Sequence, residues 1–112
     1  SIINKTHKEI ILINTSIQKI LVWGWIMFFV YLIQSKIDKN FVYTGYTPDL
    51  RKRFKKHNLG LVKSTKLKKP FRLAYYESYA SKQDAIKREQ NLKLRAKAFR
   101  QLRNRIKSCF EA

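Results

Sequence analysis

The fold of this chain is decided by the stretch FFVYLIQSKIDKNFVYTGYTPDLRKRFKKHN, residues 28–58. It holds two runs of β-branched and aromatic residues, at 28–33 and 41–46, and such runs are typical of strands. The residues between the runs include serine, aspartate and asparagine, which favour turns. The stretch therefore predicts an antiparallel hairpin, because that is the simplest connection between two neighbouring strands.

A helix is expected directly after the hairpin, ending at about residue 58. Thr47 is the expected N-cap, Pro48 fits the first helical position, and Asp49 suits the positive end of the helix dipole. Gly60, just beyond the expected end, is suited to terminate the helix. Leu50 and Phe54 form an apolar stripe that can pack against the sheet.

Polar side chains of the hairpin and the helix are expected to meet. Tyr31 lies on the first strand, and Tyr43 shares a face of the second strand with Gly45. Arg53 and His57 are four residues apart and therefore lie on one side of the helix. Two tyrosines beside an Arg–His pair, with a glycine where a ligand could approach closely, predict a functional site.

The rest of the chain predicts one more strand, at 71–79, and two more helices, at 82–94 and 96–107. Strict alternation along the third strand places Phe71, Leu73, Tyr75, Glu77 and Tyr79 on one face and Arg72, Ala74, Tyr76 and Ser78 on the other. The expected fold is an α/β sandwich of the α+β type. A three-stranded antiparallel sheet is flanked by helices in the order β-β-α-β-α-α.

Residues 1–26 lack a clear period and helix caps. The apolar run at 20–33 is shorter than the ~20 residues that span a bilayer. We expect the domain to occupy residues 27–112, with its true start at Met27 and residues 1–26 as an upstream extension. The alternative is a short helix or strand that covers a sheet edge through Trp23 and Trp25.

The composition indicates a polyanionic partner. Lys and Arg number 25 against 7 Asp and Glu, which gives a net charge of +18. So much self-repulsion favours nucleic acid as the partner over an anionic membrane, which no motif supports. The single cysteine, Cys109, excludes an internal disulfide and favours a reducing, cytoplasmic location. No Cys/His spacing typical of a zinc site is present.

Two acidic residues are not explained by chain ends, turns or helix starts, namely Glu77 and Glu89. Glu89 lies within the apolar stripe of the 82–94 helix, where an unpaired carboxylate would be costly. It must either bind a metal or form a salt bridge to Arg53, His57 or a nearby lysine. Glu77 is the weaker metal candidate and is expected to be a structural partner for an arginine.

The chain resembles the GIY-YIG endonuclease family, and most closely its small single-domain bacterial members. The resemblance covers about residues 27–106. It is carried by Phe29-Val30-Tyr31, by Tyr43-Thr44-Gly45, by the pattern Leu50, Arg53, His57 and Asn58, and by the segment from Lys63-Ser64-Thr65 to Arg88-Glu89. The sequence departs from the family pattern at Phe29, where glycine is common, and at Thr44, where isoleucine is common.

The resemblance implies a catalytic set of five residues. Glu89 is the implied ligand of one Mg²⁺ or Mn²⁺, and Arg53 would neutralise charge on the reacting phosphate. Tyr43 is the implied base, while Tyr31 would orient the attacking water or assist. His57 is a second candidate base, because the ordinary pKa of histidine suits the role. The residues themselves do not decide between Tyr43 and His57.

The expected function is therefore metal-dependent, single-metal endonuclease cleavage of nucleic acid, with DNA as the substrate and a role in DNA repair or recombination. The alternative is a non-catalytic DNA- or RNA-binding module that keeps the fold and the charge. Residues expected to contact nucleic acid are Lys52, Lys56, Asn58, Lys63, Ser64, Thr65, Lys66, Lys68, Lys69 and Arg88.

Overall fold

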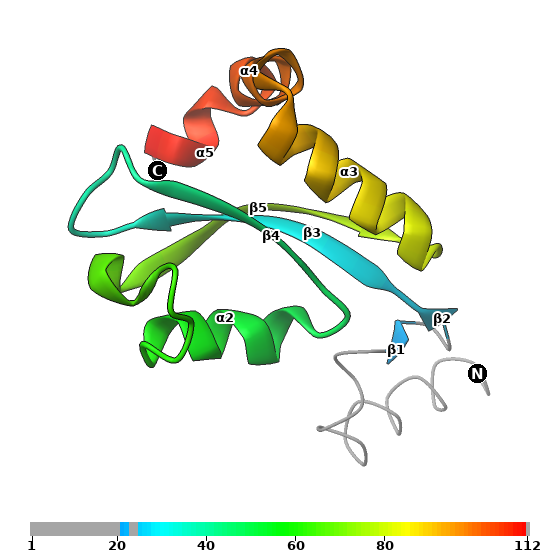
Figure 1. The fold of residues 1–112 in the computed structure, drawn as a ribbon, viewed down its shortest axis with the longest axis horizontal. Coiled ribbons are helices and arrows are strands. Elements are labelled where there is room, and N and C mark those ends of the chain that lie inside the picture. The colour runs from blue at the N-terminus through cyan, green and yellow to red at the C-terminus, as the bar shows by residue number, and fades with distance from the viewer. Residues whose placement is uncertain (1–20, 23–24, 112) are drawn as a thin grey trace, which may run out of the picture.

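The computed structural model describes residues 21–22 and 25–111. Three strands form its main sheet (Figure 1): β3 (Phe28–Ser35), β4 (Val42–Thr47) and β5 (Phe71–Tyr79). The strand order is β4-β3-β5 and both pairings are antiparallel. The hairpin of residues 28–47 thus forms as predicted, and β3 is the central strand.

Helices cover both faces of this sheet (Figure 1). Helix α2 (Leu50–Asn58) lies on one face, and α3 (Lys82–Leu94), α4 (Ala96–Arg105) and α5 (Lys107–Glu111) lie on the other. A short 3₁₀ turn, η1 (Lys66–Lys68), precedes β5. The predicted α+β sandwich is confirmed. Within the described residues, no helix has the length and apolar content needed to cross a membrane.

Two short strands precede the main sheet. β1 (Leu21–Val22) and β2 (Trp25–Ile26) pair with each other as a separate two-stranded sheet. The expectation that residues 1–26 are an upstream extension, and the alternative role of Trp23, concern residues that lie mostly outside the described part of the chain.

The central strand separates two apolar clusters, one for each helical layer. Val30 and Leu32 pack toward α3 and α4, while Tyr31 and Ile33 pack toward α2. All four side chains are fully buried. Because β3 is covered on both faces, consecutive side chains from residue 29 to 35 are buried without polar alternation.

Helix α2 begins two residues later than its sequence suggested. Asp49 is the N-cap, since its carboxylate accepts a hydrogen bond from the Lys52 amide at 3.1 Å. The Thr47 hydroxyl instead accepts from the Asp49 amide and donates to the Asp49 carbonyl, so Thr47 stabilises the preceding turn. Thr47 as N-cap and Pro48 as first helical residue were therefore wrong. Gly60, with φ of 75°, follows the helix end as predicted.

Strict alternation along β5 was also wrong, because the register shifts between Leu32 and Ile33. Tyr75 pairs with Leu32 but Leu73 pairs with Ile33, which leaves Ala74 as an extra residue in a β-bulge. The bulge reverses the faces on its N-terminal side. Phe71 and Leu73 consequently pack with the α2-side cluster, while the side chains that pack on the α3 side are Ala74, Tyr75 and Tyr79.

The C-terminal helical segment is divided. The single helix expected over residues 96–107 ends at Arg105, and α5 begins at Lys107. Ile106 separates the two with φ of −121° and ψ of 30°, outside the helical range. This break turns Phe110 back onto the α3-side cluster. Helix α3 spans residues 82–94 as predicted, capped by the Ser81 hydroxyl.

Candidate active site at the β4 edge

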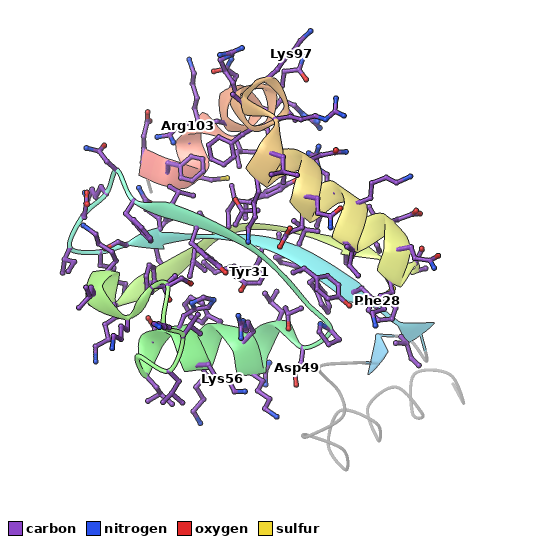
Figure 2. All side chains as sticks on the ribbon, viewed as in Figure 1. Phe28, Tyr31, Asp49, Lys56, Lys97 and Arg103 are labelled. Atoms are coloured by element: carbon purple, nitrogen blue, oxygen red, sulfur yellow. The ribbon has the colours of Figure 1, made fainter. Side chains whose placement is uncertain are left out.

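Tyr31 is the centre of a hydrogen-bonded group on the α2 side of the sheet (Figure 2). Its hydroxyl lies 2.8 Å from His57 Nε2 and 3.4 Å from Arg53 Nε. His57 Nδ1 lies 2.7 Å from the Thr65 hydroxyl, which in turn donates to the Val62 carbonyl. The spacing of Arg53 and His57 along α2 thus brings both to one tyrosine, as the sequence predicted.

The partners fix the direction of these hydrogen bonds. A guanidinium only donates, so Arg53 donates to the Tyr31 oxygen, and Tyr31 is free to donate to His57 Nε2. The Thr65 hydroxyl lies 3.5 Å from the Val62 carbonyl, so it can donate there while it accepts from His57 Nδ1. His57 is therefore a neutral acceptor at one nitrogen and a donor at the other.

Burial keeps both rings of this group uncharged. The Tyr31 and His57 side chains are fully buried. Burial raises the pKa of Tyr31 to about 12, against the opposing effect of Arg53. Burial, together with the nearby charge of Arg53, lowers the pKa of His57 to about 4. His57 has both ring nitrogens hydrogen-bonded within the interior and none of its surface exposed.

Gly45 lies directly above the Tyr31 ring, on the neighbouring strand. A Cβ atom at this position would overlap the phenol carbon and oxygen of Tyr31. The expectation that a ligand approaches Gly45 closely was therefore wrong, because the group that lies against this glycine is the Tyr31 side chain. The missing side chain lets the Tyr31 hydroxyl reach Arg53 under the edge strand.

Tyr43 is the half-buried tyrosine of the pair. Its ring centroid lies 5.2 Å from that of His57 and 6.4 Å from that of Tyr31. It also interacts with Arg53, whose pKa is raised by its hydrogen bond to Tyr31 and by Tyr43. Tyr43 belongs to the edge strand β4 and is partly exposed, whereas Tyr31 on the central strand is fully buried.

Glu89 reaches the same edge from α3, which packs against both β3 and β4. Its carboxylate lies 3.2 Å from the ammonium of Lys93, one helical turn further on, and its side chain is 19% exposed. The Lys93 ammonium also lies 5.0 Å from the centroid of the Tyr43 ring. Glu89 therefore lies on the Tyr43 side of the molecule, joined to it through Lys93.

The other acidic candidate faces elsewhere. Glu77 accepts two hydrogen bonds from the Arg88 guanidinium, both at 3.0 Å, and one each from the Tyr75 and Tyr79 hydroxyls. These interactions hold α3 on β5, and the pairing with Arg88 lowers the pKa of Glu77 against the effect of its burial. Glu77 is thus the structural arginine partner that its sequence position suggested.

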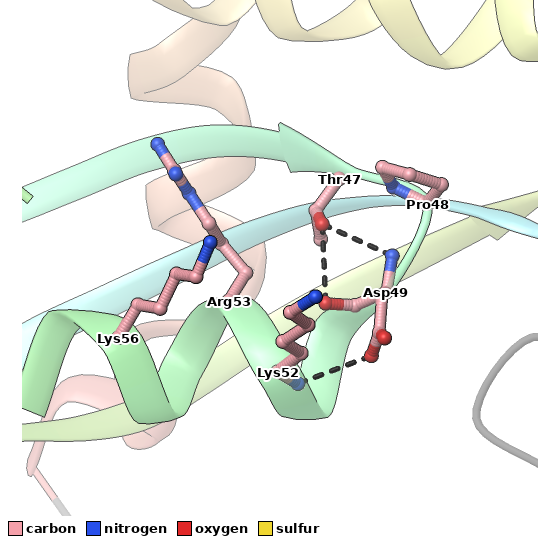
Figure 3. Close-up of a pocket in the computed structure, with 6 residues that line it drawn as sticks. All are labelled: Thr47, Pro48, Asp49, Lys52, Arg53 and Lys56. Carbon is pink, nitrogen blue, oxygen red and sulfur yellow. Dashed lines mark hydrogen bonds between the residues drawn. The ribbon is translucent and has the colours of Figure 1, made fainter. Parts of the chain in front are cut away.

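Lysines beside Arg53 line a hollow at the start of α2 (Figure 3). The hollow has a volume of about 250 Å³, and its walls are formed by Thr47, Pro48, Asp49, Lys52, Arg53 and Lys56. Among the residues expected to contact nucleic acid, those that are exposed are Lys52, Lys56, Lys63, Ser64, Lys66 and Lys69. Lys68 is half-buried and forms an ion pair with Asp38 at 2.9 Å.

Three other residues of that set have internal partners. Thr65 is 1% exposed and hydrogen-bonds to His57, so it is not a surface phosphate contact. Asn58 joins α2 to β5, accepting from the Phe71 amide and donating to the Phe71 carbonyl. The Arg88 guanidinium is occupied by Glu77. All three residues were expected to contact nucleic acid, but in the folded protein their side chains bond to other residues of the chain.

The side chains at the β4 edge can be compared with the ligands that a divalent metal ion requires. The described residues contain no group of three His, Cys, Asp or Glu side chains able to hold a metal. Glu89 is the carboxylate available, and Mg²⁺ commonly uses one or two carboxylates together with water and substrate phosphate. The site fits one hydrated ion of this kind. Lys93, which pairs with this carboxylate, is the nearby lysine of the salt-bridge alternative, and its i,i+4 spacing from Glu89 was the signal that identifies it.

The close approach at Gly45 makes a prediction about stability. Gly45→Ala should lower the free energy of unfolding by about 1–3 kcal/mol, because the new methyl group displaces the Tyr31 ring. Urea denaturation measures the change. Gly60→Ala is the control: its new Cβ meets only the flexible end of Lys69, and its cost of about 1–2 kcal/mol comes from positive φ. The absorbance change that accompanies ionisation of Tyr31 should move to lower pH in Gly45→Ala only, because the displaced ring is less buried; wild-type behaviour of that variant would contradict the prediction.

The chain is thus a small α+β domain in which Tyr31, Tyr43, Arg53, His57 and Glu89 gather near one edge of the sheet. The GIY-YIG catalytic domain matches residues 27–106, and the chain belongs to this family. It is 42% identical over 66 residues to UPF0213 proteins of Staphylococcus aureus strains N315 and Mu50, covering 58% of this chain and 78% of each relative. It is also similar to the solution structure of the UPF0213 protein BH0048 from Bacillus halodurans. That match has 35% identity and a TM-score of 0.43, and covers 69% of this chain and 82% of the other.

Proposed function

We propose that this protein is an endonuclease that hydrolyses phosphodiester bonds in DNA with one divalent metal ion. The observation that supports this most is the convergence of Tyr43, Arg53 and Glu89, from a strand and two helices on opposite faces, at one edge of the sheet. Membership of the GIY-YIG catalytic domain family supports the same reaction class. The net charge of +18 supports a polyanionic substrate.

Arg53 is proposed to bind the reacting phosphate. Its guanidinium is always charged and can neutralise the charge that develops as water attacks. The hydrogen bond from Arg53 Nε to Tyr31 orients the side chain. Tyr31 and His57 are accordingly proposed as positioning residues, since neither is exposed.

Tyr43 is proposed as the base that takes the proton of the attacking water. The alternative base, His57, is fully buried with both nitrogens hydrogen-bonded, so it could not accept that proton without breaking the network. Tyr43 is half-buried and adjoins Arg53. A general base must be within hydrogen-bonding reach of water, which favours the accessible phenol.

Glu89 is proposed to hold the metal ion, which when bound would polarise the phosphoryl oxygen and stabilise the departing 3′ oxygen. Lys52 and Lys56 flank Arg53 in the hollow at the start of α2 (Figure 3). They are proposed to bind the neighbouring phosphates of the same strand, which fixes the register of the substrate without reading its sequence.

Cleavage of supercoiled plasmid and of an RNA duplex in Mg²⁺, in Mn²⁺ and in EDTA tests the proposal. Tyr43→Phe should lower the cleavage rate on DNA by about 10²-fold or more, because it removes the base but keeps the ring. Tyr76→Phe is the matched control and should leave the rate unchanged, since Tyr76 is an exposed residue of β5 packed beside Phe29.

Equal cleavage by wild type and Tyr43→Phe would indicate a contaminating nuclease and contradict the proposal. Salt-sensitive binding with no cleavage in either ion would support the alternative, a binding module that keeps only the fold and the charge. Cleavage of RNA but not DNA would support the proposed phosphodiester hydrolysis and contradict DNA as its substrate.

A further inference from the structure

Lys93 occupies an unusual place among the basic residues. Its ammonium lies 3.2 Å from the Glu89 carboxylate and 5.0 Å from the centre of the Tyr43 ring, so it lies between two residues of the proposed site. Its own side chain is 39% exposed, whereas that of Glu89 is 19% exposed. The lysine is therefore the more exposed member of the pair.

The ion pair with Lys93 neutralises the partly buried carboxylate of Glu89. A carboxylate that is largely withdrawn from water requires a partner, and among the described residues the printed partner of Glu89 is Lys93. A divalent ion bound to Glu89 would take over that role. Two cations cannot share one carboxylate at close range without repulsion, so Lys93 and the metal compete for the same oxygen atoms.

Lys93 can move away from Glu89 and leave the carboxylate to the metal ion. A lysine side chain is a flexible stem with a compact charge, so its ammonium can leave Glu89 with little movement of the helix. The nearest alternatives are the face of Tyr43 and the phosphate that Arg53 would bind beside it. A nucleic-acid phosphate would therefore attract Lys93 away from Glu89 and vacate the metal site.

We propose that Lys93 is a tethered competitor of the metal ion, which neutralises Glu89 in the resting protein and moves to the phosphate when nucleic acid binds. This rests on the proposed function. It makes metal and nucleic acid bind cooperatively, because each favours the state in which Lys93 has left Glu89. By thermodynamic linkage the enhancement must be equal in both directions.

The experiment is a Mn²⁺ titration followed by electron paramagnetic resonance, with and without a short DNA duplex. It uses a Tyr43→Phe background, in which the duplex stays intact and the ring beside Lys93 is kept. In this parent, DNA should strengthen Mn²⁺ binding by roughly tenfold. Adding Lys93→Met should strengthen Mn²⁺ binding without DNA by a similar factor and remove most of the enhancement by DNA.

Two controls separate this role from a general effect of charge. Lys87→Met removes an exposed lysine of the same helix and should behave as the parent. Lys93→Arg keeps a cation and should retain the coupling. Unchanged Mn²⁺ affinity in Lys93→Met, in a parent that does bind Mn²⁺ through Glu89, would overturn the inference and leave the proposed function intact. If Glu89→Gln does not weaken Mn²⁺ binding in the presence of DNA, the proposed function fails instead.

Discussion

Glu89→Gln should reduce metal-dependent cleavage of DNA by on the order of 10²–10³-fold, while the fold and the affinity for DNA are retained. Glutamine has the shape of glutamate but lacks the charge that holds a divalent ion. Glu77 cannot take its place, because it lies on β5, at the far edge of the sheet from β4, and is bonded to Arg88. The described part of the chain contains no group of three His, Cys, Asp or Glu side chains that would retain the ion instead.

Stability should hardly change in this variant. The pair between Glu89 and Lys93 joins residues one helical turn apart, with a partly exposed lysine, and pairs of this kind contribute about 0.5 kcal/mol or less. Affinity for DNA without metal should be equal to or above that of wild type, because a negative charge has been removed from a basic surface. Single-turnover cleavage, thermal unfolding and fluorescence anisotropy measure the three quantities.

Asp84→Asn is the matched control for Glu89→Gln, because it makes the same chemical change in the first turn of the same helix. It should cost a few tenths of a kcal/mol through the helix dipole and leave cleavage unchanged. If Glu89→Gln cleaves at the wild-type rate, the metal is held elsewhere or is not used. If both variants lose cleavage together, the effect is one of helix stability.

His57→Ala should lower the free energy of unfolding by about 3–5 kcal/mol, a large share of the ~5–15 kcal/mol typical of a domain. His57 is fully buried, so its removal leaves a cavity between α2 and the sheet. It also leaves the hydroxyls of Tyr31 and Thr65 without their partner in an environment that excludes water. Urea denaturation measures the loss.

The same residue predicts how stability depends on pH. The pKa of His57 is about 4 in the folded protein, mainly because of burial, and about 6.5 when unfolded. The unfolded chain therefore binds a proton first as the pH falls. Its contribution to stability is complete above pH 6.5 and is lost between about pH 6.5 and 4, by at most about 3 kcal/mol.

The pH window isolates His57 from the acids. The pKa values of Glu77 and Asp38 are lowered, so these groups affect stability mainly below their ordinary pKa values of 4.5 and 3.8. Wild type should therefore lose stability between pH 6.5 and 4.5, and His57→Gln should not. His7→Gln, which changes the other histidine, is the control and should keep the wild-type slope. A flat wild-type profile over this range would contradict the buried neutral histidine.

His57→Gln also separates the two candidate bases. A glutamine side chain can accept from Tyr31 and donate to Thr65, so part of the lost stability should be recovered. If His57 only positions Tyr31 and Arg53, this variant should retain most of its cleavage activity. Complete loss of activity in a folded His57→Gln protein would make His57 the base and displace Tyr43.

Local chemistry in the sequence was sufficient for the elements. The strands near residues 28 and 42, the helix ending at Asn58 and the bounds of α3 follow from β-branched runs, caps and a glycine with positive φ. The same patterns failed where two local signals competed. Thr47 and Asp49 can both cap a helix, and the hydrogen bond from the Lys52 amide to Asp49 decides between them.

Contacts between segments far apart in the sequence determined the features that local patterns did not predict. The bulge at Ala74 depends on how β5 fits against β3, and no periodicity within β5 records it. The burial of His57 and Thr65 requires the loop after α2 to fold back over that helix. Lys93 meets Tyr43 only because α3 lies against the β4 edge.

The sequence by itself determined the element types, the sheet with helices on both faces, the excess positive charge and the identity of the residues that gather at the β4 edge. Only the tertiary structure decided which of them are accessible and which are buried supports, and that Lys93 lies against Tyr43. The physical reason is the distance along the chain over which each kind of interaction acts. Strand, turn and capping preferences act over a few residues, whereas burial, hydrogen-bond direction and charge pairing are set by neighbours that come together only when the sheet and its two helical layers have packed.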